Sequence, residues 1–190
     1  VARCVISLVI AFDVRDPKAG VSAFDQISNE LGEVDVLIYN AGSGEWNNVE
    51  QTTIEGMESS WQTNTLGLLV AGQQVIPAMK TKATGAIVVI GATASLRGGA
   101  NSTAFASAKS AQRSLAQSMA RRLGPMGIHV SYVIIDGIID LERTRAARPD
   151  IPDEYYLQPE EMAQSVVDLT GQHRSAWTVE LDLRPFGEKW

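Results

Sequence analysis

The fold prediction starts from the segment Val34-Asp35-Val36-Leu37-Ile38-Tyr39-Asn40-Ala41-Gly42, in which a short apolar run ends at polar and small residues. Two further apolar runs follow at residues 86–90 and 128–135. Segments with helical apolar spacing separate the three runs, near residues 53–81 and 103–123. Strands that alternate with helices are typical of a parallel sheet with helices on both faces. The sequence therefore predicts an α/β fold with a doubly wound parallel sheet.

The two long helical segments have recognisable ends. Thr52 or Thr53, followed by Glu55, is typical of a helix start, and Gly124-Pro125 is typical of a stop. The last alternating segment, residues 177–184, predicts an edge strand. A stripe with four-residue spacing predicts a core-facing side on the second helix, formed by Leu115, Met119 and Leu123.

Composition limits the class of protein. A chain of 190 residues that is 45% apolar is large enough for one domain, spanning residues 1–190. A net charge of −6 argues against a nucleic-acid partner, because phosphate backbones are bound by clustered Lys and Arg. The single cysteine, Cys4, and the distant His129 and His173 predict neither a disulfide nor a metal site, and they favour the reducing cytoplasm.

The apolar run from Val5 to Phe12 follows Arg3 and faintly resembles a secretory leader. The sequence shows no small-residue cleavage signal before Asp13, and eight residues are too few to span a bilayer. The run is therefore interpreted as a buried strand, and no membrane partner is expected.

Five groups of polar and small residues lie in a fixed order along the chain. They are Asp13-Val14, Asn40-Ala41-Gly42, Asn64, the stretch from Phe105 to Lys109, and Asp136-Gly137. In order and spacing these groups resemble the short-chain dehydrogenase/reductase family. Residues 91–99 and the tail at 175–190 are most similar to an atypical subgroup of bacterial oxidoreductases. The resemblance runs from Phe12 onward and implies a Rossmann-like fold.

The resemblance also implies where a nicotinamide cofactor, NAD or NADP, binds. The positions that match the family's cofactor contacts are Asp13, Val14, Asn40, Ala41, Gly42, Lys109, Asp136 and Gly137. Asp136-Gly137 departs from the family's usual Pro-Gly, and Leu141 stands where a Thr commonly meets the nicotinamide amide. A small-molecule substrate and a homodimer or homotetramer are implied as well. Trp61 and Met119 are candidate contacts or, equally, core residues.

The family's catalytic set is incomplete in this chain. Its proton-donating Tyr corresponds to Phe105, and its Ser, thirteen residues earlier, corresponds to Ala92. Lys109 keeps the family's ribose-binding role, or is a solvated helix lysine. Asn64 matches the family's proton-relay Asn. Thr93 is placed either to hydrogen-bond a substrate oxygen or, as is commoner for a Thr at a strand end, to cap backbone groups.

A segment bracketed by Pro149, Pro152 and Pro159 shows neither helix nor strand periodicity and predicts a lid or loop. Tyr155 or Tyr156 could swing in from this lid and replace the missing acid. Ordinary packing of the lid is the alternative for both side chains.

The family's glycine-rich turn is not found before Asp13, where twelve residues stand. That turn lets backbone N–H groups and a helix dipole approach the cofactor's pyrophosphate. A complete member would carry roughly 50 more residues there, about the size of one β-α-β unit. The chain is therefore expected to be a fragment that lacks this first unit, or a genuine short form. The choice between NAD and NADP stays open.

These observations predict an NAD(P)-dependent oxidoreductase that acts on a carbonyl or alcohol and has a degenerate catalytic site. Turnover would then use a proton from water held by Asn64 and Lys109. The alternative is a catalytically inactive cofactor-sensing or assembly subunit with the same fold, because Phe105 and Ala92 carry no proton donor.

Overall fold

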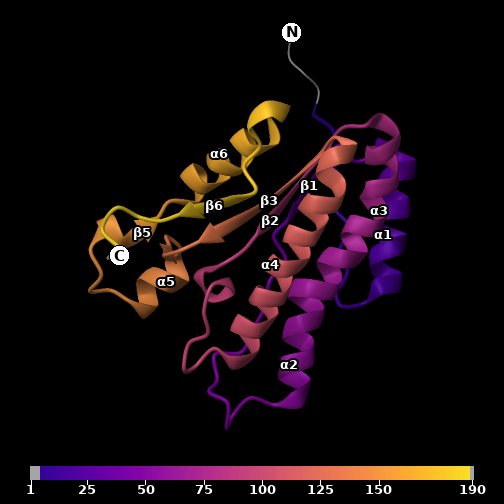
Figure 1. Cartoon of the computed structure of the whole chain (residues 1–190). Coiled ribbons are helices and arrows are strands. Elements are labelled where there is room, and N and C mark those ends of the chain that lie inside the picture. The colour runs from indigo at the N-terminus through magenta and orange to yellow at the C-terminus, as the bar shows by residue number, and fades with distance from the viewer. Residues whose placement is uncertain (1–4, 189–190) are drawn as a thin grey trace.

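Within residues 5–188, which the computed structural model describes, four parallel strands form the main sheet (Figure 1). Their order is β1, β2, β3, β6, and each strand pairs with the next. The strands are β1 (Val36–Tyr39), β2 (Gly85–Ile90), β3 (Ile128–Ile135) and β6 (Glu180–Leu183). The three predicted apolar runs are confirmed as strands. The predicted edge strand is confirmed as well, although it is shorter than the alternating segment.

Helices connect the strands of the sheet. They are α1 (Pro17–Leu31), α2 (Ile54–Trp61), α3 (Gly67–Lys82), α4 (Thr103–Leu123), α5 (Glu142–Ala147) and α6 (Pro159–Thr170). A π-helical segment, Gln62–Leu66, joins α2 to α3. A small parallel sheet pairs β4 (Ile138–Ile139) with β5 (Tyr156–Leu157). This small sheet fixes part of the segment that the sequence predicted to be a lid or loop.

Helices cover both faces of the main sheet, as predicted. In Figure 1, α3 and α4 lie on one face, α1 packs beside α3, and α6 lies on the other face. Because successive side chains of a strand point to opposite faces, Ile87 and Val89 join the core under α3 and α4, whereas Val88 faces α6. The smaller core on the α6 side contains Val88, Val133, Val166 and Leu169.

The predicted helix ends are confirmed. Thr53 is the residue that caps α2, because its hydroxyl oxygen accepts a hydrogen bond of 2.9 Å from the backbone N–H of Gly56. The second long helix, α4, ends at Leu123, directly before Gly124-Pro125. Met119 and Leu123 are buried in the main core, and Leu115 packs against it. The stripe on α4 therefore faces the core, and Met119 is one of its members.

The predicted buried strand at Val5 to Phe12 is wrong. These residues form neither strand nor helix, and the side chains of Val5 and Val9 are 86% and 92% exposed. An apolar run becomes a buried strand when a neighbouring strand pairs with its backbone and other side chains cover it. None of the described strands pairs with this segment. Arg3, Cys4 and residues 189–190 lie outside the described residues.

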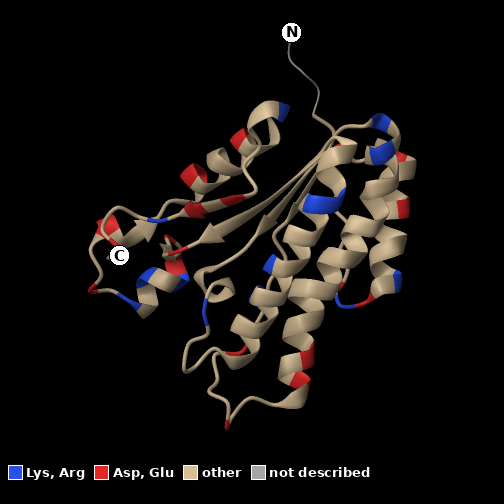
Figure 2. Cartoon of the chain, viewed as in Figure 1, with Lys and Arg blue, Asp and Glu red and all other residues tan. Residues whose placement is uncertain are grey.

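Acidic and basic residues are spread over most of the elements (Figure 2). No group of three or more His, Cys, Asp or Glu residues in the described part of the chain could hold a metal ion. Among residues 5–188, the helices lack the combination of length and apolar composition that crossing a bilayer requires.

Two adjacent leucines of α3 test the packing of this helix. Leu68 is fully buried and Leu69 is 38% exposed. Leu68→Ala removes methyl groups from a close-packed core, so we expect it to lower the free energy of unfolding by about 3 kcal/mol. Leu69→Ala is the matched control and should cost less than about 1 kcal/mol. Urea denaturation of the two variants measures both values, and equal losses would contradict the orientation of α3.

Candidate functional site

A pocket of about 400 Å³ lies at the carboxyl ends of β1, β2 and β3. In doubly wound sheets this edge is the usual place for a ligand, because the chain leaves each strand there and its loops diverge. The described residues that line the pocket are Asn40, Gly42, Trp46, Ile90, Gly91, Ala92, Thr93, Ala94, Phe105, Lys109, Ile135, Gly137, Ile139 and Arg143.

Lys109 projects from α4 and is only 5% exposed. Its Nζ donates hydrogen bonds of 3.0 Å to the carbonyl oxygen of Ile90, at the end of β2, and to Oε1 of Gln112. Burial disfavours the charged form and lowers the pKa of Lys109 to about 8. The alternative that Lys109 is a solvated helix lysine is therefore wrong.

Asn64 lies in the π-helical segment and is fully buried. Its Nδ2 donates to the carbonyl oxygens of Ser43 and Ser60, at 2.6 and 2.8 Å. Its Oδ1 accepts no hydrogen bond from any described residue. A Cβ added at Gly42 would lie 3.4 Å from this Oδ1 and 3.4 Å from Nζ of Lys109. An unpartnered acceptor and an ammonium group thus both lie next to Gly42, although Asn64 is not among the described residues that line the pocket.

Gln112 links these two residues, and its role was not predicted from the sequence. Its Nε2 donates to the carbonyl oxygen of Asn64 at 2.9 Å, while its Oε1 accepts from Lys109. Tyr132 of β3 also donates towards Oε1 of Gln112, at 3.4 Å, and burial raises the pKa of this tyrosine to about 12. The available signal was spacing, because Gln112 stands three residues after Lys109 and shares its helix face.

Phe105 lies one helical turn before Lys109 and lines the same pocket. Its ring centroid is 5.9 Å from Nζ of Lys109 and 5.0 Å from the ring centroid of Trp46. Ala92 lines the pocket at the end of β2. Neither side chain has a hydroxyl, so neither can donate a proton to a bound oxygen.

Thr93 lines the pocket, and its hydroxyl is already engaged. It donates to Oδ1 of Asp136 at 2.5 Å, and Asp136 forms an ion pair with Arg184. Asp136 is 8% exposed and does not line the pocket. Asp136 therefore fixes the direction of the Thr93 hydroxyl from a position outside the pocket lining.

Tyr156 does not reach this pocket. It is buried in β5, its hydroxyl donates to the carbonyl oxygen of Arg148 at 2.9 Å, and the guanidinium of Arg145 lies 3.9 Å from its ring centroid. Neither Tyr155 nor Tyr156 is among the described residues that line the pocket. The structure therefore places Tyr156 in the packing of this region.

A family model described as short chain dehydrogenase matches residues 5–151. The chain belongs to the short-chain dehydrogenase family. The 3-oxoacyl-[acyl-carrier-protein] reductase FabG of Salmonella typhimurium is 30% identical to it over 141 residues. These residues make up 74% of this chain and 57% of that reductase, so the chain spans little more than half of this relative.

Two solved structures show the same fold. A short-chain dehydrogenase from Rhodopseudomonas palustris is 32% identical, with a TM-score of 0.76, and the match covers 92% of this chain and 73% of that one. An alcohol dehydrogenase from the archaeon Thermococcus sibiricus, complexed with 5-hydroxy-NADP, is 23% identical, with a TM-score of 0.80. That match covers 93% of this chain and 74% of the other. The Rossmann-like fold expected from the sequence is confirmed.

Six of the eight residues that the sequence predicted as cofactor contacts line two pockets of this short-chain dehydrogenase. Asn40, Gly42, Lys109 and Gly137 line the pocket described above, together with Thr93 and Phe105, which the sequence predicted as catalytic positions. Val14, Asn40 and Ala41 line a second pocket of about 200 Å³ beside β1. Asn40 belongs to both pockets, so the two share one wall.

Asp13 and Asp136 line neither of these pockets. The carboxylate of Asp13 pairs with Arg15, whose side-chain hydrogen bonds are the largest cause of a pKa lowered to about 2. Arg15 in turn donates to Ser59 of α2, three residues before the π-helical segment that carries Asn64. In this structure Asp13 therefore anchors the chain next to α2.

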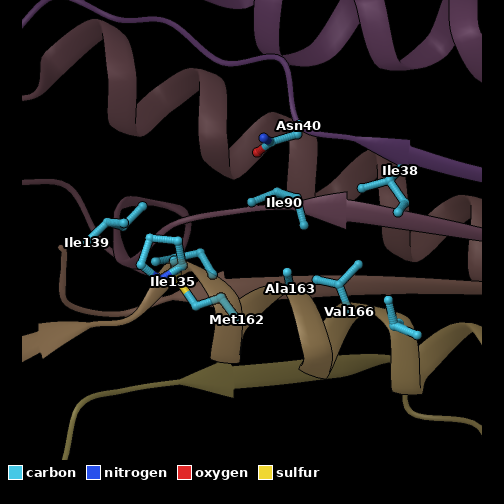
Figure 3. A pocket seen from close by; sticks show the side chains of 10 residues that line it. Ile38, Asn40, Ile90, Ile135, Ile139, Met162, Ala163 and Val166 are labelled. Atoms are coloured by element: carbon cyan, nitrogen blue, oxygen red, sulfur yellow. The ribbon is translucent and has the colours of Figure 1, made fainter. Parts of the chain in front are cut away.

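A third pocket, of about 350 Å³, is apolar and lies between the sheet and α6 (Figure 3). Isoleucines of the sheet edge, Ile38, Ile90 and Ile135, line one side, and Met162 and Val166 of α6 line the other. Asn40, Ile90, Ile135 and Ile139 also line the pocket that holds Lys109. The apolar surface therefore continues the candidate active site towards α6.

The depressed pKa of Lys109 predicts a pH-dependent stability term. Between pH 8 and 10.5 the unfolded chain binds a proton at this lysine that the folded chain has released, so its contribution to stability rises with pH. Lys109→Met removes this pH-dependent contribution to the free energy of unfolding. The unfolding free energy of the variant minus that of the wild type should fall by on the order of 2 kcal/mol from pH 8 to pH 10. Denaturant titrations across this range measure the difference, and a flat difference would show that Lys109 is not desolvated.

Proposed function

We propose that this chain is part of an NAD(P)-dependent oxidoreductase acting on a small carbonyl or alcohol compound, with a degenerate proton-donating position. The observation that carries the proposal is the buried Lys109 beside the unpartnered Oδ1 of Asn64, at the carboxyl edge of the sheet. Membership of the short-chain dehydrogenase family supports it, as does the NADP analogue bound to the Thermococcus sibiricus relative.

The residues present suit a nicotinamide cofactor. Lys109 offers a donor to ribose hydroxyls, and the glycine at position 42 leaves room beside it, because any side chain there would meet Lys109 and Asn64. Asn40 and Ala41 extend this surface towards Val14. The bound cofactor would supply or accept a hydride. The proposal covers NAD and NADP alike.

In the absence of a tyrosine, a proton would have to come from water. A buried acceptor without a partner is the type of group that an ordered water satisfies, and both Oδ1 of Asn64 and Nζ of Lys109 lie next to Gly42. Such a water would accept from the ammonium and donate to Asn64 or to the substrate oxygen. A positioned general acid is worth about 10² to 10⁴ in rate, so we expect slow chemistry.

A catalytically inactive subunit is the second candidate, and one observation favours it. Phe105 packs against Trp46 in the position of the missing acid, with no hydroxyl at Ala92 to assist. Such a subunit would bind the cofactor and assemble with copies of itself. Trp61 of α2, which is 46% exposed, is a candidate contact for that assembly, in keeping with the two-fold pairing of the family's long helices.

Fluorescence titration with NADH and NADPH tests cofactor binding by the protein. We expect one or both to bind, and Lys109→Met to weaken binding about tenfold through the loss of a charged donor. Lys80→Met is the matched control, because Lys80 is exposed in the last turn of α3. If neither nucleotide binds, this part of the protein does not hold the cofactor by itself, and the result counts against both the oxidoreductase proposal and the cofactor-sensing alternative for the 190-residue chain.

Restoring the missing hydroxyls separates the two candidates. The double variant Phe105→Tyr with Ala92→Ser introduces a proton-donating phenol and a hydrogen-bonding hydroxyl at two positions that line the pocket. If the chain supports hydride transfer, this variant should reduce an aldehyde or ketone panel about 100-fold faster than the wild type. Phe105→Leu is the control and should give no gain. A double variant that binds the cofactor but stays inactive would favour the non-catalytic subunit.

A further inference from the structure

Arg143 is the second cationic side chain among the described residues that line the pocket of Lys109. It lies in the short helix α5, is exposed, and forms no hydrogen bond or ion pair with any described residue. Its neighbour Arg145 differs, because ion pairs with Asp140 and Asp153 occupy that guanidinium. Of these two arginines, Arg143 is therefore the one with donors available to a ligand.

The sign of the charge in the pocket is opposite to that of the chain. The protein has 22 Asp and Glu residues against 16 Lys and Arg, yet none of the described residues that line this pocket is acidic. The basic residues on α5 are blue in Figure 2. A concave site lined by charges of one sign concentrates the field and attracts ligands of the other sign.

The rest of the wall suits a flat, apolar body. The rings of Trp46 and Phe105 lie 5.0 Å apart between centroids, tilted by 42°, and both line the pocket. Ile90 and Ile139 add aliphatic surface. A planar carbonyl compound with one anionic group would thus meet aromatic and aliphatic surface along its body and a guanidinium at its charged end.

We propose that this pocket binds an anionic carbonyl compound, and that Arg143 pairs with its carboxylate or phosphate. A guanidinium presents parallel donors that match two oxygens of such a group. The assignment of the ligand as the reacting carbonyl rests on the proposed function. The anion site itself rests on the residues that line the pocket. The cofactor's own phosphates carry the same chemistry, so the experiment distinguishes the two sources.

Binding of benzoylformate and of its methyl ester compares one scaffold with and without a charge. Isothermal titration should show that the wild-type protein binds the acid about tenfold more tightly than the ester. Arg143→Gln should bring the ratio close to one by weakening binding of the acid alone. Arg122→Gln, an equal change of charge at an exposed position at the far end of α4, should keep the wild-type ratio.

A second arm measures NADPH and NADH affinity of the same variants. If Arg143→Gln weakens nucleotide binding and leaves the ratio of acid to ester unchanged, Arg143 serves the cofactor and the substrate assignment is overturned. Equal wild-type affinity for acid and ester, or no binding of the acid, also overturns it. If the wild-type protein binds neither NADPH nor NADH, the result instead counts against the proposed function. The ratio of acid to ester affinity is measured without cofactor, so it still decides whether the pocket holds an anion site.

Discussion

The burial of the Lys109 ammonium group is the constraint on which the rest of this site depends. A charged amine in a core is costly unless its hydrogens find acceptors, and here the carbonyl oxygen of Ile90 and the amide of Gln112 provide them. These partners belong to the end of β2 and to α4, and Gln112 in turn donates a hydrogen bond to the backbone carbonyl oxygen of Asn64. One set of hydrogen bonds therefore joins the sheet edge, α4 and the π-helical segment around the pocket.

The π-helical segment between α2 and α3 holds Asn64, the unpartnered acceptor that lies next to Gly42, as the ammonium of Lys109 does. A π-turn displaces one residue from the regular hydrogen-bond ladder and is common at functional sites. Asn64 uses the irregularity, because its amide nitrogen bonds backward to the carbonyl oxygen of Ser60 and outward to that of Ser43. Its oxygen is consequently left to face Lys109 across Gly42. The acceptor lies in the π-helical segment and the donor in α4, and no hydrogen bond joins Oδ1 of Asn64 to a described residue.

Much of the fold could be predicted because local patterns and tertiary packing agree in it. The runs that became β1, β2 and β3, the cap at Thr53 and the stop at Gly124-Pro125 all follow from short-range chemistry. Val5 to Phe12 shows the limit of that reasoning, since apolar composition does not specify a pairing partner. Gln112 shows a second limit, because its role exists only after α4 packs against the π-helical segment.

The carboxylate of Asp136 determines how the hydroxyl of Thr93, which lines the pocket, can interact with a ligand. Asp136, paired with Arg184, is an acceptor, so the proton of Thr93 points to Asp136 and away from the pocket. Thr93 then presents a lone pair to a ligand and is a poor substitute for the donor lost at Ala92. Stabilisation of negative charge on a bound oxygen must therefore come from elsewhere in the described wall. Under the proposed function, Lys109, the buried cation of this wall, would supply it, and the chemistry of the pocket would then depend on the same ammonium that organises its structure.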